Sequence, residues 1–211
     1  MSWRNELFAQ WDSTYRPDIY RARVQMFRAM PASKKDILFA GDSITFWGDW
    51  TEMLGKKKIK NRGIPGDTSF GLLEYLDELL KAKPRKLFVM IGVNDLARKV
   101  PVDVLLANYK RIVQICSNIS PATKVYFQTI LPVNRDFKKL ENHYAAASRI
   151  EQVNDSLRSW SAENKIELLD LYPLFADSEK QLKKEWTWDG VHLTIEGYRQ
   201  WIALLKSKKL I

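Results

Sequence analysis

A serine near the N-terminus, and an aspartate and a histidine near the C-terminus, are the residues of this chain best suited to chemistry. Ser43 lies in the stretch Gly-Asp-Ser-Ile-Thr, where an apolar run stops, and Asp189 and His192 lie in the tetrapeptide Asp-Gly-Val-His. A serine hydroxyl is a weak nucleophile, an imidazole can take its proton, and a carboxylate can orient the imidazole. These residue types predict a nucleophilic hydrolase, provided that the chain between them brings them to one site.

Each of these residues also has a simpler interpretation. Taken alone, a serine such as Ser43 at the start of a helix is a cap. The second histidine of the chain, His143, competes with His192 for the role of base. Glu141 is the one carboxylate near His143 along the chain, and a helix is predicted over Tyr144–Trp160 directly after it. This pattern favours a surface or packing histidine at position 143.

Strand-length apolar runs alternate along the chain with amphipathic stretches whose apolar residues repeat every three or four positions. This alternation predicts an α/β fold with a parallel sheet and helices packed on both of its faces. The predicted strands are Ile37–Ala40, Lys58–Asn61, Lys86–Ile91, Lys124–Ile130 and Ile166–Asp170. The predicted helices carry apolar stripes that include Leu72 and Leu76, Leu105 and Tyr109, Ile150 and Val153, and Tyr198 and Trp201.

The suspected site residues follow the predicted strands. Ligands bind at the carboxyl ends of the strands in an open parallel sheet. Ser43 follows the first strand, Gly66 the second and Asn94 the third, while Asp189 and His192 lie in the long loop after the fifth. The sequence therefore predicts that these loops converge on one edge. The loops of Gly66 and Asn94 also fit an ordinary turn and an ordinary helix start.

Four sequence blocks in this order resemble the GDSL esterase family, also called SGNH hydrolases. The resemblance covers residues 36 to about 205 and departs from the family at Ile44, which stands in place of the leucine in its name. The blocks are Gly41–Ser43, Gly63–Thr68, Gly92–Asp95 and Asp189–Leu193. The resemblance implies a three-layer α/β/α sandwich of flavodoxin-like topology with a central five-stranded parallel sheet.

The resemblance also implies hydrolysis of carboxylic esters without a cofactor or a metal. Ser43 is then the nucleophile that forms an acyl-enzyme, His192 the general base and Asp189 the residue that orients it. The implied oxyanion hole comprises the N–H groups of Ser43 and Gly66 and the side chain of Asn94. Losing one such donor typically costs about 2.7–4 kcal/mol of transition-state stabilisation.

The blocks look most similar to members related to platelet-activating-factor acetylhydrolase and to sugar O-acetylesterases, which favours a short-chain ester, with an acetylated sugar as the leading candidate. A lysophospholipase or thioesterase with a longer acyl groove, and a catalytically silent carbohydrate-binding module, stay open as alternatives. Four tryptophans near the motifs either offer flat faces for sugar stacking or pack the edge of the sheet. These are Trp47, Trp50, Trp186 and Trp188.

Composition sets the remaining expectations. The length of 211 residues predicts a single domain over 1–211, with residues 1–30 as a helix and loop outside the core. The net charge of +9 fits an anionic substrate, such as an acidic sugar, or a solvated lysine-rich exterior. The single cysteine, Cys116, lies on a predicted apolar stripe, which favours a buried structural thiol and excludes a multi-cysteine zinc site.

We find no nucleic-acid-binding module, no apolar run long enough to span a membrane and no signal peptide in the sequence. A periplasmic or secreted location is expected if a signal was removed, and a cytoplasmic one otherwise. The expected partner is a small-molecule or glycan ester, and the oligomeric state is open.

Overall fold

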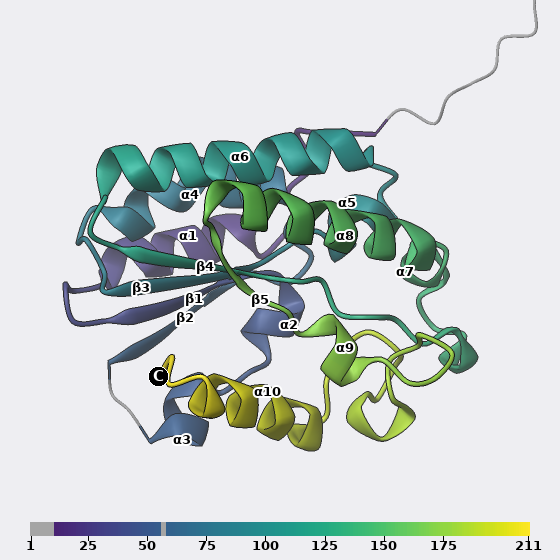
Figure 1. Cartoon of the computed structure of the whole chain (residues 1–211). Helices are drawn as coiled ribbons and strands as arrows, with labels where there is room; N and C mark the ends of the chain where they lie inside the picture. The colour runs from purple at the N-terminus through teal and green to yellow at the C-terminus, as the bar shows by residue number, and fades with distance from the viewer. Residues whose placement is uncertain (1–10, 56–57) are drawn as a thin grey trace, which may run out of the picture.

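Five short strands form one sheet in which every neighbouring pair is parallel. The computed structural model, which describes residues 11–55 and 58–211, gives the strand order β2-β1-β3-β4-β5 (Figure 1). The five predicted strands are confirmed, with ends that move by one or two residues. They are β1 (Ile37–Gly41), β2 (Ile59–Gly63), β3 (Lys86–Met90), β4 (Lys124–Gln128) and β5 (Glu167–Leu169).

Helices cover both faces of the sheet, so the predicted three-layer α/β/α arrangement is confirmed (Figure 1). One layer contains α1 (Tyr20–Ala29), α4 (Ser69–Leu80), α6 (Val102–Ile119) and α8 (Ala147–Asn164). The other contains α2 (Ser43–Phe46), α3 (Trp50–Leu54) and α10 (Ile195–Ser207). The loops hold the short elements α5 (Val93–Ala97), η1 (Arg135–Phe137), α7 (Glu141–Tyr144), α9 (Tyr172–Phe175) and η2 (Lys184–Trp186).

Stacked aromatic rings fill the space between the sheet and α10. Phe39 of β1 stacks on Phe88 of β3 at 4.8 Å and on Trp50 of α3 at 4.2 Å between ring centroids. Trp201 of α10 meets Trp50 edge-on, and its indole N–H donates to Gln128 Oε1 at 2.8 Å. A ring of this size buries about 150–250 Å². At ~25 cal/mol per Å², that is about 4–6 kcal/mol of gross hydrophobic stabilisation for each ring.

The N-terminal helix α1 packs against α4, and its buried side chains are Tyr20, Val24 and Phe27. The Tyr20 hydroxyl donates to the Gly71 carbonyl at 2.9 Å. The prediction of an N-terminal helix and loop over residues 1–30 falls partly on residues 1–10, which lie outside the described residues. The assignment of 1–211 to a single domain stays a prediction.

The helix predicted over Tyr144–Trp160 is wrong at its beginning. The chain forms α7, which ends at Tyr144, and then α8, which begins at Ala147 and continues to Asn164. The break has a tertiary cause, because the Tyr144 hydroxyl donates to the Asp189 carbonyl at 2.6 Å and Ala146 is fully buried. Such contacts leave no periodic signal in the sequence.

Two further features bear on the sequence-based expectations. Cys116 is buried, and burial raises the pKa of its thiol to about 12, as befits a structural cysteine. No helix within residues 11–55 and 58–211 is long and apolar enough to cross a membrane.

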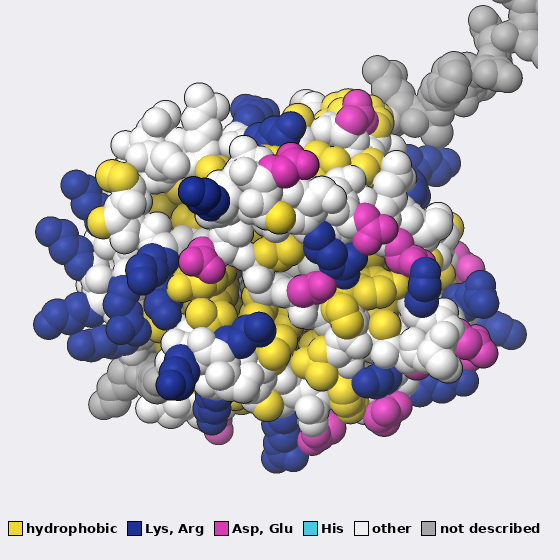
Figure 2. Space-filling model, viewed as in Figure 1, with side chains coloured by type: hydrophobic (Ala, Val, Ile, Leu, Met, Phe, Trp, Pro, Cys, Tyr) yellow, Lys and Arg dark blue, Asp and Glu magenta, His cyan; other side chains and the backbone are white. Residues whose placement is uncertain are grey.

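Lys and Arg side chains are spread over the face shown in Figure 2 and are dense at its left edge. That edge is where the strands begin in Figure 1, away from the loops at their carboxyl ends. Much of the positive charge on this face therefore lies on a solvated exterior.

Candidate active site

Ser43 lies at the point where β1 ends and α2 begins, and it is 8% exposed. The Asp42 carboxylate caps this helix by accepting a hydrogen bond from the Ile44 N–H at 2.9 Å. The Ser43 N–H belongs to the first turn, where backbone donors have no intrahelical acceptor. The cap is therefore Asp42, and the hydroxyl of Ser43, which sequence alone could interpret as the cap, is left for another partner.

A chain of hydrogen bonds joins Ser43, His192 and Asp189. His192 Nε2 lies 2.8 Å from Ser43 Oγ, and His192 Nδ1 lies 2.6 Å from Asp189 Oδ2. Burial raises the pKa of Asp189, but hydrogen bonds from the His192 ring and from the N–H groups of His192 and Val191 outweigh it, so the net pKa is lowered. An ionised carboxylate accepts the Nδ1 proton, which leaves Nε2 free to accept from the serine hydroxyl. The structure brings these three predicted residues together.

The loop that carries Asp189 and His192 is held on several sides. Asp189 Oδ1 accepts from the N–H groups of Val191 at 2.9 Å and His192 at 2.8 Å. Gly190 has a φ of +87°, and a Cβ there would lie 2.2 Å from the Asn134 carbonyl oxygen, so this position requires glycine. Because both carboxylate oxygens are occupied, the loop fixes the aspartate relative to the imidazole.

Gly66 and Asn94 lie beyond the ends of β2 and β3, on either side of β1. Gly66 has a φ of +77°, and no hydrogen bond among the described residues uses its N–H. The Asn94 amide Nδ2 donates to the Asp67 carbonyl at 2.9 Å. Each amide nitrogen carries two hydrogens, so Asn94 keeps a second donor. Both residues were predicted for this edge of the sheet.

Three buried carboxylates, those of Asp42, Asp67 and Asp95, hold these loops through hydrogen bonds. Burial raises the pKa of Asp42 to about 7 and that of Asp95 to about 6, and it raises the pKa of Asp67 well above its usual value. Asp95 accepts from the Ser69 N–H at 2.9 Å, and Asp67 accepts from the Tyr75 hydroxyl at 3.1 Å. The sequence motifs contained these aspartates, but only the structure shows that they hold the loops in place.

His143 is a site residue that sequence reasoning assigned to the surface or to packing. It is half-buried on α7, and its Nε2 lies 3.0 Å from Asn94 Oδ1. Burial lowers its pKa, and the charges of His192 and Arg98 lower it further, against an opposing effect of Asp189. The ring is therefore neutral at neutral pH. The sequence holds no signal for this contact, because 49 residues separate the two partners.

A polar cavity of about 800 Å³ adjoins Gly66 and Asn94. Its wall includes His143 and the aromatic side chains of Trp11 and Tyr15. Three basic and two acidic residues complete the charged part of the lining: Arg98, Lys99, Lys139, Asp12 and Glu141. The cavity therefore offers polar groups, aromatic faces and a net positive charge next to the predicted oxyanion donors.

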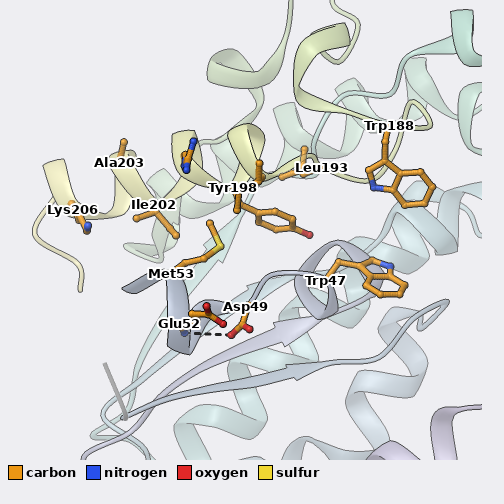
Figure 3. A pocket seen from close by; sticks show the side chains of 12 residues that line it. Trp47, Asp49, Glu52, Met53, Trp188, Leu193, Tyr198, Ile202, Ala203 and Lys206 are labelled. Carbon is orange, nitrogen blue, oxygen red and sulfur yellow. Dashed lines mark hydrogen bonds between the residues drawn. The ribbon is translucent and has the colours of Figure 1, made fainter. Parts of the chain in front are cut away.

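An apolar groove of about 980 Å³ runs between α3 and α10. Figure 3 shows Trp47 and Trp188 at one end, Lys206 at the other, and Met53 and Ile202 between them. Trp188 also stacks on the His192 ring at 5.2 Å between centroids, so this end of the groove adjoins the predicted base.

Two of the four tryptophans considered for sugar stacking are exposed. Trp47 is 57% exposed and Trp188 is 51% exposed. The interpretation is wrong for Trp50, which is 1% exposed because its ring fills the aromatic core. Trp186 is covered by Phe175 and by the Lys183 ammonium.

In the part of the chain that the structure describes, no group of three His, Cys, Asp or Glu side chains is arranged to hold a metal ion.

The sequence matches a known protein family and several curated proteins. Residues 39–200 match the model of the GDSL-like Lipase/Acylhydrolase family. Among curated proteins, the N-acylneuraminate cytidylyltransferase of Streptococcus agalactiae serotype III (strain NEM316) is 30% identical over 132 residues, which is 63% of this chain and 30% of that protein. The chain thus spans about a third of the length of the curated relatives it matches.

Solved structures match over most of the chain. A protein of Streptococcus pneumoniae, provisionally named a platelet activating factor, has a TM-score of 0.80 and 32% identity, with 90% of each chain covered. A GDSL-like lipase of Bacteroides thetaiotaomicron VPI-5482 has a TM-score of 0.77 and 25% identity, with 91% of this chain and 98% of that chain covered.

Proposed function

The chain belongs to the GDSL-like lipase/acylhydrolase family, and we propose that Ser43, His192 and Asp189 are its catalytic triad. Members of this family hydrolyse carboxylic esters, and this chain is a carboxylic ester hydrolase. The observation that carries the proposal is the continuous hydrogen-bonded chain from Ser43 Oγ through both imidazole nitrogens to the Asp189 carboxylate, with links of 2.8 and 2.6 Å. Activation of a serine hydroxyl needs a base in hydrogen-bond reach and a third group that orients the base.

In this mechanism Ser43 Oγ attacks the ester carbonyl carbon while His192 Nε2 takes the hydroxyl proton. The tetrahedral intermediate collapses, and His192 returns that proton to the leaving alcohol oxygen as the bond from carbon to this oxygen breaks. Water then attacks the acyl-serine while His192 Nε2 takes a proton from the water. The bond from the carbonyl carbon to Ser43 Oγ breaks, His192 returns the proton to Ser43 Oγ, and the carboxylic acid is released. Asp189 stays ionised and stabilises the imidazolium formed in each step.

The oxyanion hole of this proposal comprises the N–H groups of Ser43 and Gly66 and the free amide hydrogen of Asn94. These donors are fixed before substrate arrives, since two belong to the backbone and the third is held by its neighbours. Preorganised donors of this kind stabilise the developing charge with little reorganisation.

We assign the leaving alcohol to the polar cavity and infer a short acyl group on a carbohydrate. The cavity adjoins Gly66 and Asn94 directly, and it combines polar side chains with the aromatic faces of Trp11 and Tyr15. Such a lining suits a hydroxyl-rich ring better than an aliphatic alcohol.

The basic residues of the polar cavity extend this proposal to acidic sugars. Arg98, Lys99 and Lys139 outnumber the two acidic residues of the lining. The curated relatives are named for N-acylneuraminate, which is an acidic sugar, and this chain matches only a part of them. We expect kcat/KM on an acetylated acidic sugar to fall as NaCl is added, because salt screens the attraction. Equal salt responses of acidic and neutral acetylated sugars would refute this extension.

The proposal is tested by ester hydrolysis with purified protein. We expect release of acetate from p-nitrophenyl acetate and from acetylated sugars by the wild type, and none above background by Ser43→Ala. Thermal unfolding of both proteins controls for folding. Hydrolysis by Ser43→Ala at the wild-type rate would refute the role of Ser43.

The groove between α3 and α10 favours a second candidate function, a hydrolase of longer acyl esters such as lysophospholipids or acyl-thioesters. Its apolar wall and its position next to Trp188 would suit an aliphatic chain. A series of p-nitrophenyl esters from acetate to decanoate distinguishes the two functions. Rates highest for acetate support the short-chain esterase, whereas rates that rise with chain length and drop in Ile202→Asp support the second function.

A further inference from the structure

His143 lies outside the Ser43–His192–Asp189 chain, yet its imidazole contacts a proposed oxyanion donor. Its Nε2 lies 3.0 Å from Asn94 Oδ1, while Asn94 Nδ2 lies 2.9 Å from the Asp67 carbonyl oxygen. A carbonyl oxygen only accepts hydrogen bonds, so the amide nitrogen must face Asp67 and the amide oxygen must face His143. It follows that His143 Nε2 carries a hydrogen and donates it to Asn94.

These two hydrogen bonds fix the Asn94 amide at its nitrogen and at its oxygen. The torsion that turns an asparagine amide about its Cβ–Cγ bond has broad energy wells, so an isolated amide is poorly fixed. With Nδ2 bound to Asp67 and Oδ1 bound to His143, the plane of the amide is set. Its second N–H then points in one direction, which is the condition for a preorganised oxyanion donor.

We propose that His143 is a positioning residue that orients the Asn94 amide as an oxyanion donor. The proposal rests on the proposed function, because it assigns a role to Asn94 in the same site. The position of His143 on α7 strengthens it. The next residue, Tyr144, donates from its hydroxyl to the Asp189 carbonyl at 2.6 Å. Consecutive residues of one short helix thus contact the oxyanion side and the acid–base side of the site.

The contacts of His143 do not suit a general base. Its Nε2 is bound to Asn94 Oδ1, and among the described residues no carboxylate is hydrogen-bonded to its ring. His192, by contrast, has a carboxylate on Nδ1 and the serine hydroxyl at Nε2. We therefore expect His143 to act through Asn94.

A double-mutant cycle tests this inference with p-nitrophenyl acetate as substrate. We expect Asn94→Ala to lower kcat by about 10²–10³-fold, the usual effect of a lost oxyanion donor. We expect His143→Ala to lower kcat by roughly tenfold with KM nearly unchanged. In the double variant the loss should equal that of Asn94→Ala alone, because the function of His143 disappears with its partner.

Two further variants separate positioning from packing. His143→Gln retains an N–H donor near the position of Nε2 and should recover most of the wild-type kcat. Ser148→Ala, an exposed polar-to-alanine change early in α8, is the matched control and should leave kcat unchanged. Thermal unfolding should be similar in all of these proteins.

Additive losses in the double variant, an effect on KM alone, or no recovery in His143→Gln would overturn the inference. Ser43→Ala in the same assay separates this failure from that of the proposed function. If Ser43→Ala is inactive and the losses are additive, only the role of His143 fails. If Ser43→Ala remains active, the proposed triad itself fails.

Discussion

Replacing Asp189 by asparagine should inactivate the protein with little change of its fold. Asp189 Oδ1 accepts from two backbone N–H groups, those of Val191 and His192, so the amide oxygen of an asparagine must take that place. Its NH₂ group then faces His192 Nδ1, where the carboxylate oxygen lay at 2.6 Å. Two N–H groups cannot be bonded to each other, so the imidazole is forced into the tautomer with its hydrogen on Nε2. That tautomer cannot accept the proton of Ser43.

The expected loss in kcat is about 10⁴-fold, the size of effect known for a wrong histidine tautomer in a serine triad. This corresponds to about 5 kcal/mol of transition-state stabilisation at 1.36 kcal/mol per factor of ten. The loss in stability should be far smaller, because the asparagine keeps the two backbone hydrogen bonds. Asp189→Ala provides the contrast, since it removes all three bonds and should lower the free energy of unfolding by about 2–4 kcal/mol.

The assay is hydrolysis of p-nitrophenyl acetate, with chemical denaturation of the same preparations. The reasoning predicts that Asp189→Asn is inactive and stable, and that Asp189→Ala is inactive and destabilised. A rate of Asp189→Asn within tenfold of the wild-type rate would refute the role of Asp189 in setting the tautomer.

The remaining predictions concern the framework of the site. Gly190→Ala places a Cβ 2.2 Å from the Asn134 carbonyl oxygen at a φ of +87°, and it should lower the free energy of unfolding by at least about 2 kcal/mol in a denaturant titration; an unchanged midpoint would contradict this. Trp201→Phe removes the N–H that donates to Gln128 and leaves the buried Gln128 Oε1 without a partner. The free energy of unfolding should fall by about 2–4 kcal/mol in the same titration. Asp42→Asn tests the effect of burial, which raises the pKa of Asp42 to about 7. Native Asp42 holds its proton to a higher pH than the unfolded chain, so its stabilising contribution is present below about pH 4 and lost as the pH rises through 7. Asp42→Asn should therefore gain stability relative to the wild type between pH 4 and 8, by an amount of the order of 4 kcal/mol, and a difference that does not change with pH would contradict the assignment.

Local patterns were enough to predict the sheet and the residues at its carboxyl edge. The interior strand β1 is a continuous apolar run because both faces of the sheet are covered there, and that feature is written in consecutive residues. Ser43, Gly66 and Asn94 directly follow strands, so their convergence follows from the parallel order. Asp189 and His192 are three residues apart in one loop, and their mutual geometry is set locally.

Contacts between distant segments could not be predicted in the same way. Trp47 and Trp50 are three residues apart, yet one is 57% exposed at the groove and the other 1% exposed in the core. Their difference depends on where α3 meets β1 and α10. The contact of His143 with Asn94 depends on the break between α7 and α8, for which the residues around 145 give no periodic signal.

Covalent labelling of Ser43 tests the central claim most directly. The wild-type protein is treated with a fluorophosphonate, and the modified residue is identified by peptide mass spectrometry. We predict one adduct on Ser43, no adduct in Ser43→Ala, and strongly slowed labelling in His192→Ala, with all three proteins folded. A folded wild type that is not labelled would contradict the account and favour a silent binding module, and an adduct on another residue would place the nucleophile elsewhere.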